Sequence, residues 1–132
     1  MMARYLVDTD WVIDYLNGRP ATVERLAALQ SQGLSISVIS LAELYEGVHS
    51  SRDPEGSLRA LDDFLRTVTV VPLDDRVCDF FGKERGRLRR LGKLIGDFDL
   101  LIGATAVRHS MVLLTNNQRH FELVDGLTVV SL

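Results

Sequence analysis

The sequence predicts an α/β fold with a mainly parallel central sheet of about five strands. Short apolar runs rich in Val, Ile and Leu alternate along the chain with segments of helical periodicity. That alternation is typical of βαβ units, whose right-handed crossovers cover both faces of one sheet with helices. One segment, 97–107, is apolar nearly all round and is expected to form a buried helix. The expected strands are 4–7, 34–39, 68–73, 111–114 and 127–132, and the expected helices are 10–16, 21–33, 40–48, 54–65, 77–95 and 97–107.

The first strand and helix are predicted from the segment RYLVDTDWVIDYLNG. Its first four residues are too few for a helix, and their aromatic and β-branched side chains favour pleated structure. The apolar spacing that follows predicts a helix, capped by Thr9 or Asp10 and ended by Asn17 with Gly18. Asp8 stands at the end of the strand, on the edge where open α/β sheets bind ligands.

The remaining elements are predicted from changes in period and from helix-breaking residues. Gly33 ends one helix, and the β-rich run LSISVI then predicts the second strand. Ser40 begins the next helix, and Pro54 opens another because proline is tolerated at a first helical position. Pro72 closes the third strand, after which the helical period resumes.

The 132 residues are expected to form a single domain, 1–132, because no linker, repeat or low-complexity tract divides them. Apolar and charged fractions of 46% and 25% are typical of a soluble globular protein. The sequence contains no candidate membrane span or secretory signal, so a cytoplasmic protein without membrane contact is expected. The single cysteine, Cys78, excludes an internal disulfide, and the histidines lack zinc-ligand spacing.

One segment is strongly basic although the net charge of the chain is −3. In GKERGRLRRLGK, residues 82–93, six cations stand against one acid. Apolar residues recur at helical spacing through 77–95, so the cations lie off the buried stripe of an amphipathic helix. Such a pattern is typical of a solvated helix face or, alternatively, of a surface that binds phosphates. The candidate RNA contacts are Lys83, Arg87, Arg90 and Lys93.

Oxygen-bearing side chains follow several of the predicted strands. Asp8 ends the first strand, Glu43 lies one turn into the helix after the second, and Asp97 and Asp99 open the apolar helix. Each has a structural alternative, because acids favour helix N-termini and the motif SLAE that ends at Glu43 fits a capping box. The fourth strand is followed by TNN, residues 115–117, which also fits an Asx turn.

Carboxylates that converge at one edge of a sheet repel one another unless a cation neutralises them. Mg²⁺ suits such a site because it prefers oxygen ligands and binds through one or two carboxylates together with substrate phosphates. Mn²⁺ suits the same oxygen donors and is an expected substitute. An acidic pocket beside a basic helix therefore predicts metal-assisted hydrolysis of phosphodiester bonds.

Four segments together resemble the PIN-domain ribonucleases, and within them the VapC toxins of bacterial toxin–antitoxin modules. They are LVDTDWVIDYL, ISVISLAELYEG, IGDFDLLIGATAV and LLTNNQRHFELVDGLTVV, in matching order and spacing along essentially the whole chain. The resemblance implies a PIN-like three-layer α/β/α sandwich. It also implies that Asp8, Glu43 and Asp99 are the catalytic and metal-binding acids.

The resemblance assigns roles to further residues. Thr9 and Thr115 match hydroxyls that orient acids or water in the family, and Asp97 is a supporting candidate. Asn117 stands where many relatives carry a fourth acid and is a candidate metal ligand. With one negative charge fewer, we expect one tightly held ion and a second that arrives with RNA.

The resemblance also implies partners. These are a second copy in a homodimer, a VapB-type antitoxin whose C-terminal segment blocks the acidic groove, and structured RNA such as tRNA as the substrate. Cleavage is expected to leave a 5′-phosphate and a 3′-hydroxyl. Trp11, Tyr15, Tyr45 and Val48 are candidates for the antitoxin groove, the dimer surface or ordinary core packing.

Two other functions stay open from the sequence. The Asp-x-Asp pair also resembles haloacid dehalogenase-type phosphatases, with Asp8 as nucleophile and Asp10 as acid/base, although the later motifs of that family are not evident. Alternatively, the domain binds RNA or a partner without cutting, and Asn117 marks the loss of the site.

Overall fold

A five-stranded, all-parallel sheet forms the centre of the protein. The computed structural model describes residues 4–132. The strands are β1 (Tyr5–Val7), β2 (Leu34–Ser37), β3 (Thr69–Val71), β4 (Val112–Leu114) and β5 (Val129–Val130). They lie in the order β3-β2-β1-β4-β5, with every neighbouring pair parallel. The predicted α/β class and mainly parallel sheet are confirmed.

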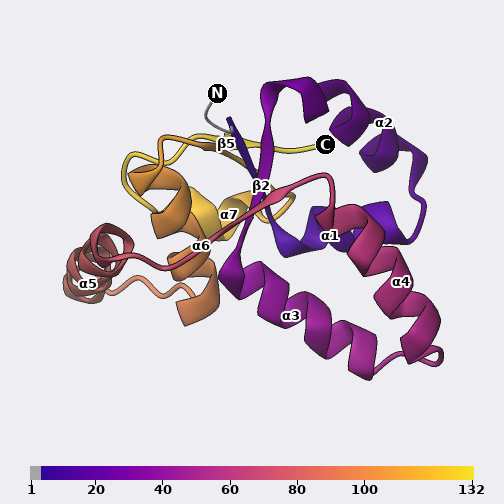
Figure 1. Ribbon diagram of the computed structural model, residues 1–132. Coiled ribbons are helices and arrows are strands. Elements are labelled where there is room, and N and C mark those ends of the chain that lie inside the picture. The colour runs from indigo at the N-terminus through magenta and orange to yellow at the C-terminus, as the bar shows by residue number, and fades with distance from the viewer. Residues whose placement is uncertain (1–3) are drawn as a thin grey trace.

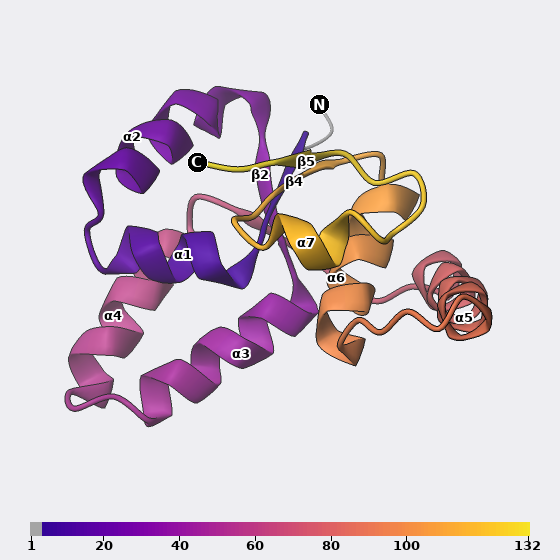
Figure 2. The same ribbon diagram turned by 180° about the vertical axis from the view of Figure 1, so that it is seen from behind.

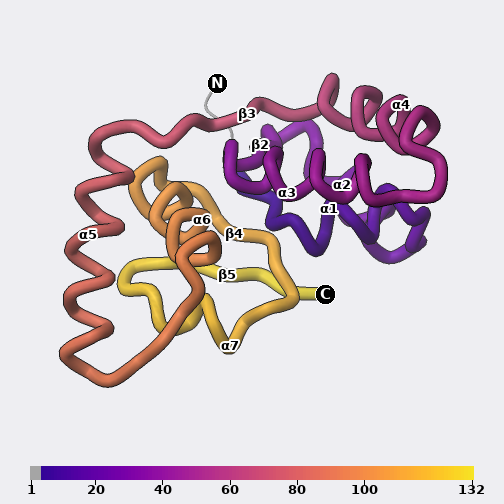
Figure 3. Tube along the Cα trace, turned by 90° about the horizontal axis from the view of Figure 1, so that it is seen from below, coloured from indigo at the N-terminus to yellow at the C-terminus, as the bar shows by residue number. Residues whose placement is uncertain are grey.

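Helices cover both faces of the sheet, which makes three layers (Figures 1 and 2). On one face lie α1 (Thr9–Leu16), α2 (Pro20–Leu29), the 3₁₀ turn η1 (Gln30–Gln32), α3 (Val38–His49) and α4 (Pro54–Leu65). On the other lie α5 (Asp75–Arg90), α6 (Asp97–Arg108) and α7 (Gln118–Phe121). Seen from below, the two groups of helices separate clearly, with α5 on the outside of α6 (Figure 3). Within residues 4–132, no helix has the length and apolarity to cross a bilayer.

The alternation of side chains along the strands divides the core into two halves. Val7 and Leu114 pack toward α1–α4, whereas their neighbours Leu6 and Leu113 pack toward α6 and α7. All four side chains are fully buried, as expected for a parallel sheet covered on both faces. Helix α6 is buried along most of its length, including Leu100 and residues 102–106, so its predicted central position is confirmed.

Some element boundaries differ from those predicted. The second strand ends at Ser37 rather than at residue 39, because the Ser37 hydroxyl accepts from the Ile39 N–H and starts α3 two residues before Ser40. Helix α1 is capped by Asp8, whose Oδ1 accepts from the Thr9 N–H, rather than by Thr9 or Asp10. The basic helix ends at Arg90 instead of residue 95, and the short α7 had no counterpart in the prediction.

Candidate active site

The site is centred on Asp8, which directly follows β1. Because β1 and β4 are parallel neighbours with Val7 opposite Leu114, the residues that follow these two strands meet at one edge of the sheet. The Asp8 side chain is 6% exposed. Its Oδ1 accepts from the Thr9 N–H at 2.8 Å, and its Oδ2 accepts from the Thr115 hydroxyl at 2.7 Å. Backbone and side chain thus fix the direction of this carboxylate.

Asp10 provides a second carboxylate beside Asp8. Its Oδ1 accepts from the Trp11 N–H at 2.7 Å, and its Oδ2 accepts from the Asn116 N–H at 3.0 Å. The same Oδ2 lies 3.4 Å from the Thr115 hydroxyl that donates to Asp8. As an expected helix cap, Asp10 was not among the candidate site residues for the ribonuclease reading, but the structure brings it into the site.

The environment of this acidic pair disfavours negative charge. The pKa of Asp8 is raised from 3.8 to about 7, chiefly by burial and also by the charges of Asp10 and, to a smaller extent, Asp99, against the lowering effect of its hydrogen bonds. Burial is also the main reason why the pKa of Asp10 is raised. A cation beside these groups would favour their ionised forms, because an opposite charge offsets both the lost hydration and the mutual repulsion.

Glu43 joins the site through Thr9. The Thr9 hydroxyl donates to Glu43 Oε1 at 2.8 Å and pairs with the Ser40 hydroxyl at 2.9 Å, which connects the first turn of α1 with α3. The capping-box alternative for Glu43 is wrong, since Ser37 caps α3 and Ser40 lies inside the helix. The expected contact between Thr9 and an acid is present, and Ser40 is an additional hydroxyl that the sequence analysis missed.

Asp99 lies in the first turn of α6 and meets two side chains from the segment after β4. Its Oδ2 is 3.4 Å from Asn117 Nδ2 and 3.2 Å from His120 Nδ1, and these two nitrogens are 3.0 Å apart. The structure therefore brings Asn117 to Asp99, as its candidate role requires. His120 was not predicted, although its position three residues after Asn117 matches the spacing of neighbours on one helical turn.

Asp97, the supporting candidate, points away from these acids. Its carboxylate is 76% exposed and forms an ion pair with Arg85 of α5. Among residues 4–132, the hydrogen bonds of the Asp97 side chain include none to the other candidate residues, and its supporting role stays a prediction. Of the two acids that open α6, Asp99 is the one that faces the site.

The donor set fits a hard divalent cation. In the part of the chain that the structure describes, no three Asp, Glu, His or Cys side chains are gathered closely enough to coordinate an ion by themselves. Asp8, Asp10, Asp99 and Glu43 could nevertheless offer carboxylate oxygens to such an ion, and Asn117 could offer its amide oxygen. Mg²⁺ commonly uses one or two carboxylates and completes its shell with water and phosphate oxygens, so this set is sufficient.

The basic helix is partly structural. Glu84 is 5% exposed, and it accepts two hydrogen bonds from Arg87, at 2.7 and 2.9 Å. Arg87 also donates to the Leu123 carbonyl at 2.7 Å. The hydrogen bonding of Arg87 to Glu84 is the main reason why the pKa of Glu84 is lowered. Because its guanidinium is already engaged, Arg87 is dropped from the candidate RNA contacts. Lys83, Arg90 and Lys93 are exposed and stay predictions.

A groove of about 290 Å³ runs between α1, α3 and α4 and reaches the acidic site. Its apolar walls include Ile13, Leu16 and Val48, and Glu43 stands in its lining. Of the four apolar residues considered for such a surface, Trp11 follows the core-packing alternative: its side chain is fully buried, and its indole N–H donates to Asn116 Oδ1 at 3.1 Å. Val48 does line the groove.

Comparisons with known proteins agree with this fold. The family model of the PIN domain matches residues 5–127, so the chain belongs to the PIN-domain family. Within that family its relatives are VapC proteins. Ribonuclease VapC2 of Haemophilus influenzae is 33% identical over 126 residues, and the tRNA(fMet)-specific endonuclease VapC of Shigella flexneri is 32% identical; each comparison covers 96% of both chains. The DNA-bound VapBC structure from Salmonella typhimurium superimposes with a TM-score of 0.92 at 30% identity, covering 98% of both chains.

Proposed function

We propose that this protein is a Mg²⁺-dependent endoribonuclease that acts in the cytoplasm as the toxin of a type II toxin–antitoxin module. The observation that carries the proposal is the buried Asp8 carboxylate, which is held beside Asp10 and Asp99 at the carboxyl edge of the sheet. Burial of a group that needs a cation to ionise is typical of a catalytic metal site rather than of a structural one. Membership of the PIN-domain family supports this function.

The residues of the site divide into those that face the substrate and those that position them. Asp8, Asp99 and Asn117 would hold Mg²⁺, with Glu43 completing the acidic set. When bound, Mg²⁺ supplies the charge that lowers the pKa of the attacking water and stabilises charge on the phosphoryl oxygens. Thr115 orients Asp8, and Thr9 orients Glu43. A phosphodiester attacked by water here would yield a 5′-phosphate and a 3′-hydroxyl.

His120 adds an ionisable group to this mechanism. Its Nδ1 lies 3.2 Å from Asp99 Oδ2, so the imidazole can hold that carboxylate in one orientation. The ring is about half exposed, which leaves its other nitrogen accessible to an RNA strand. We assign His120 as a positioning residue for Asp99.

The proposed substrate is structured RNA of the tRNA class, and the proposed partner is a VapB-type antitoxin. The name of the Shigella flexneri relative supports the first, and the VapBC structures of relatives support the second. We propose that an antitoxin segment occupies the groove between α1, α3 and α4, because a chain that follows its apolar walls reaches Glu43. The homodimer expected from the family is part of this proposal.

The test is cleavage of end-labelled total tRNA by the antitoxin-free protein with Mg²⁺, with Mn²⁺ and with EDTA. Discrete fragments that require metal, and that disappear in Asp8→Asn, are expected. Bound but intact RNA would favour the non-cleaving module. Phosphate release from a small phosphomonoester, with a trapped phosphoaspartate at Asp8, would favour the phosphatase. Products with a 2′,3′-cyclic phosphate would refute attack by water.

A further inference from the structure

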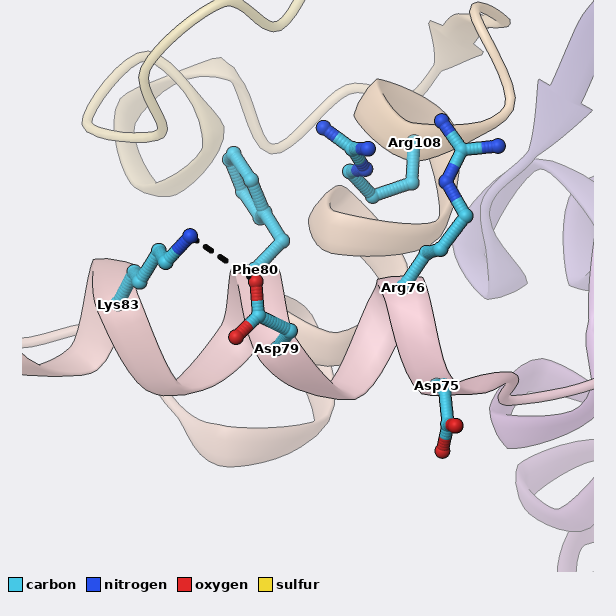
Figure 4. A pocket seen from close by; sticks show the side chains of 6 residues that line it. All are labelled: Asp75, Arg76, Asp79, Phe80, Lys83 and Arg108. Carbon is cyan, nitrogen blue, oxygen red and sulfur yellow. Dashed lines mark ion pairs between the residues drawn. The ribbon is translucent and has the colours of Figure 1, made fainter.

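A second cavity lies between α5 and α6, at the end of α6 farthest from Asp99. Its volume is about 320 Å³. The lining residues are Asp75, Arg76, Asp79, Phe80, Lys83 and Arg108. Figure 4 shows the Arg76 and Arg108 side chains above the same face of α5, with the Arg108 guanidinium turned toward the Phe80 ring and the Arg76 guanidinium on the far side of Arg108, whereas Asp75 points away from them. Arg108 is nine residues beyond Asp99, which is about 14 Å along the helix.

Neither guanidinium in this cavity forms a close ion pair with a carboxylate of residues 4–132. Among residues 4–132, the only cation in the lining with an ion pair is Lys83, whose Nζ lies 3.0 Å from Asp79 Oδ2. The nearby Asp74 carboxylate is 3.2 Å from His109 Nε2, and the charge of Arg76 contributes only a minor part of the lowering of its pKa. A cavity with two unpaired arginines attracts an anion.

One of these two arginines, Arg108, also has a buried N–H without a hydrogen-bond acceptor. The Nε atom of Arg108 is buried, and no acceptor in residues 4–132 hydrogen-bonds to it. The great majority of buried donors in native structures are hydrogen-bonded, and a buried donor without an acceptor lowers stability. A bound oxygen anion would supply acceptors for the arginine fork, whose geometry matches phosphate.

We propose that this cavity binds a backbone phosphate of the RNA substrate, at a position remote from the cut, with a neighbouring base stacked on Phe80. The proposal rests on the ribonuclease function proposed above. Stacking of a base on an aromatic face is tolerant of sequence. Sites for single strands combine such a stacking side chain with cations that contact the phosphates, and this cavity contains both.

The arrangement of α5 favours an RNA strand over a free nucleotide. Arg76, Lys83 and Arg90 are spaced by seven residues, so they lie in nearly one line along the helix, over about 21 Å. Helices α5 and α6 run antiparallel, since His109 meets Asp74 at one end and Asp97 meets Arg85 near the other. The line of cations therefore leads from the cavity toward the end of α6 that carries Asp99. A mononucleotide would use only the cavity.

The experiment measures binding of tRNA at several salt concentrations, in EDTA, to the cleavage-deficient Asp99→Asn protein with and without Arg76→Gln. The matched control is Arg59→Gln, which removes an exposed arginine from α4 on the other face of the sheet. We expect Arg76→Gln to weaken binding roughly tenfold and to reduce the slope of log K against log salt by about one, and Arg59→Gln to change neither. Arg76→Lys should restore most of the salt slope that Arg76→Gln loses. Phe80→Leu should weaken tRNA binding without changing the salt slope.

Three outcomes would overturn the inference. The first is an equal, measurable loss of tRNA affinity in Arg76→Gln and Arg59→Gln. The second is an unchanged tRNA affinity in both variants. The third is an Arg76-dependent site that inorganic phosphate or uridine monophosphate binds as tightly as tRNA does. The proposed function is tested separately by Mg²⁺-dependent cleavage with the otherwise unsubstituted protein. An Arg76-dependent salt slope without cleavage by that protein would support the RNA site while refuting the nuclease.

Discussion

Replacing Asp8 with Asn should stabilise the metal-free protein at neutral and alkaline pH while abolishing cleavage. Asp8 is almost fully buried, and its pKa is raised from 3.8 to about 7. Asn keeps the acceptor for the Thr9 N–H and removes the charge. The substitution therefore tests whether the buried carboxylate of Asp8 lowers the free energy of unfolding of the metal-free protein.

The sign of the pH dependence follows from proton binding. Between pH 3.8 and 7 the folded state retains a proton on Asp8 that the unfolded chain releases, so the stability of the wild type falls as pH rises through this window. The shift is roughly three units at about 1.4 kcal/mol each, which makes the loss on the order of 4 kcal/mol above pH 7. Burial also raises the pKa of Asp10, so this carboxylate contributes to the pH dependence in the same direction.

The assay is urea unfolding in EDTA from pH 4 to pH 8.5. Asp8→Asn should match the wild type near pH 4 and exceed its free energy of unfolding by a few kcal/mol at pH 8, whereas Asp62→Asn, an exposed change on α4, should follow the wild type throughout. A constant difference across the pH range, or a less stable Asp8→Asn protein at pH 8, would refute the reasoning.

Three further predictions concern the metal, the hydroxyl that orients Asp8, and the basic helix. Mg²⁺ at about 100 times its Kd should raise the stability of the wild type by about 2.7 kcal/mol at neutral pH, and calorimetry should find no such gain in Asp8→Asn. Thr115→Val removes the hydrogen bond to Asp8 and should lower kcat at least tenfold with little loss of Tm; equal kcat values would contradict the orienting role. Arg87→Met leaves the Glu84 carboxylate with the Asp125 N–H as its remaining partner and should lower the free energy of unfolding in urea, whereas Arg90→Gln should leave stability unchanged and weaken tRNA binding. If the Arg87→Met protein is as stable as the wild type, the structural role of Arg87 is refuted and Arg87 is again a candidate RNA contact.

The sheet and its helices could be predicted because their signals are local. The run at 5–7 and the run at 112–114 are continuous and apolar, since strands covered on both faces bury most of their side chains. The boundaries could not be predicted as well. Ser37 and Ser40 are equally good caps by sequence, and only the register of β2 against its neighbours makes Ser37 the last residue of the strand.

The sequence by itself determined the class of fold and the polar residues that follow the strands, because side-chain period and strand order place those positions at one edge of a parallel sheet. Only the tertiary structure decided which of them act together. The packing of α6 against α5 turns Asp99 toward Asn117 and His120, and it leaves Asp97 with Arg85. Spacing along one helix contains no information about the surface opposite each residue. Burial of Asp8 depends for the same reason on residues as distant as Thr115, whose arrival at the end of β4 completes the site.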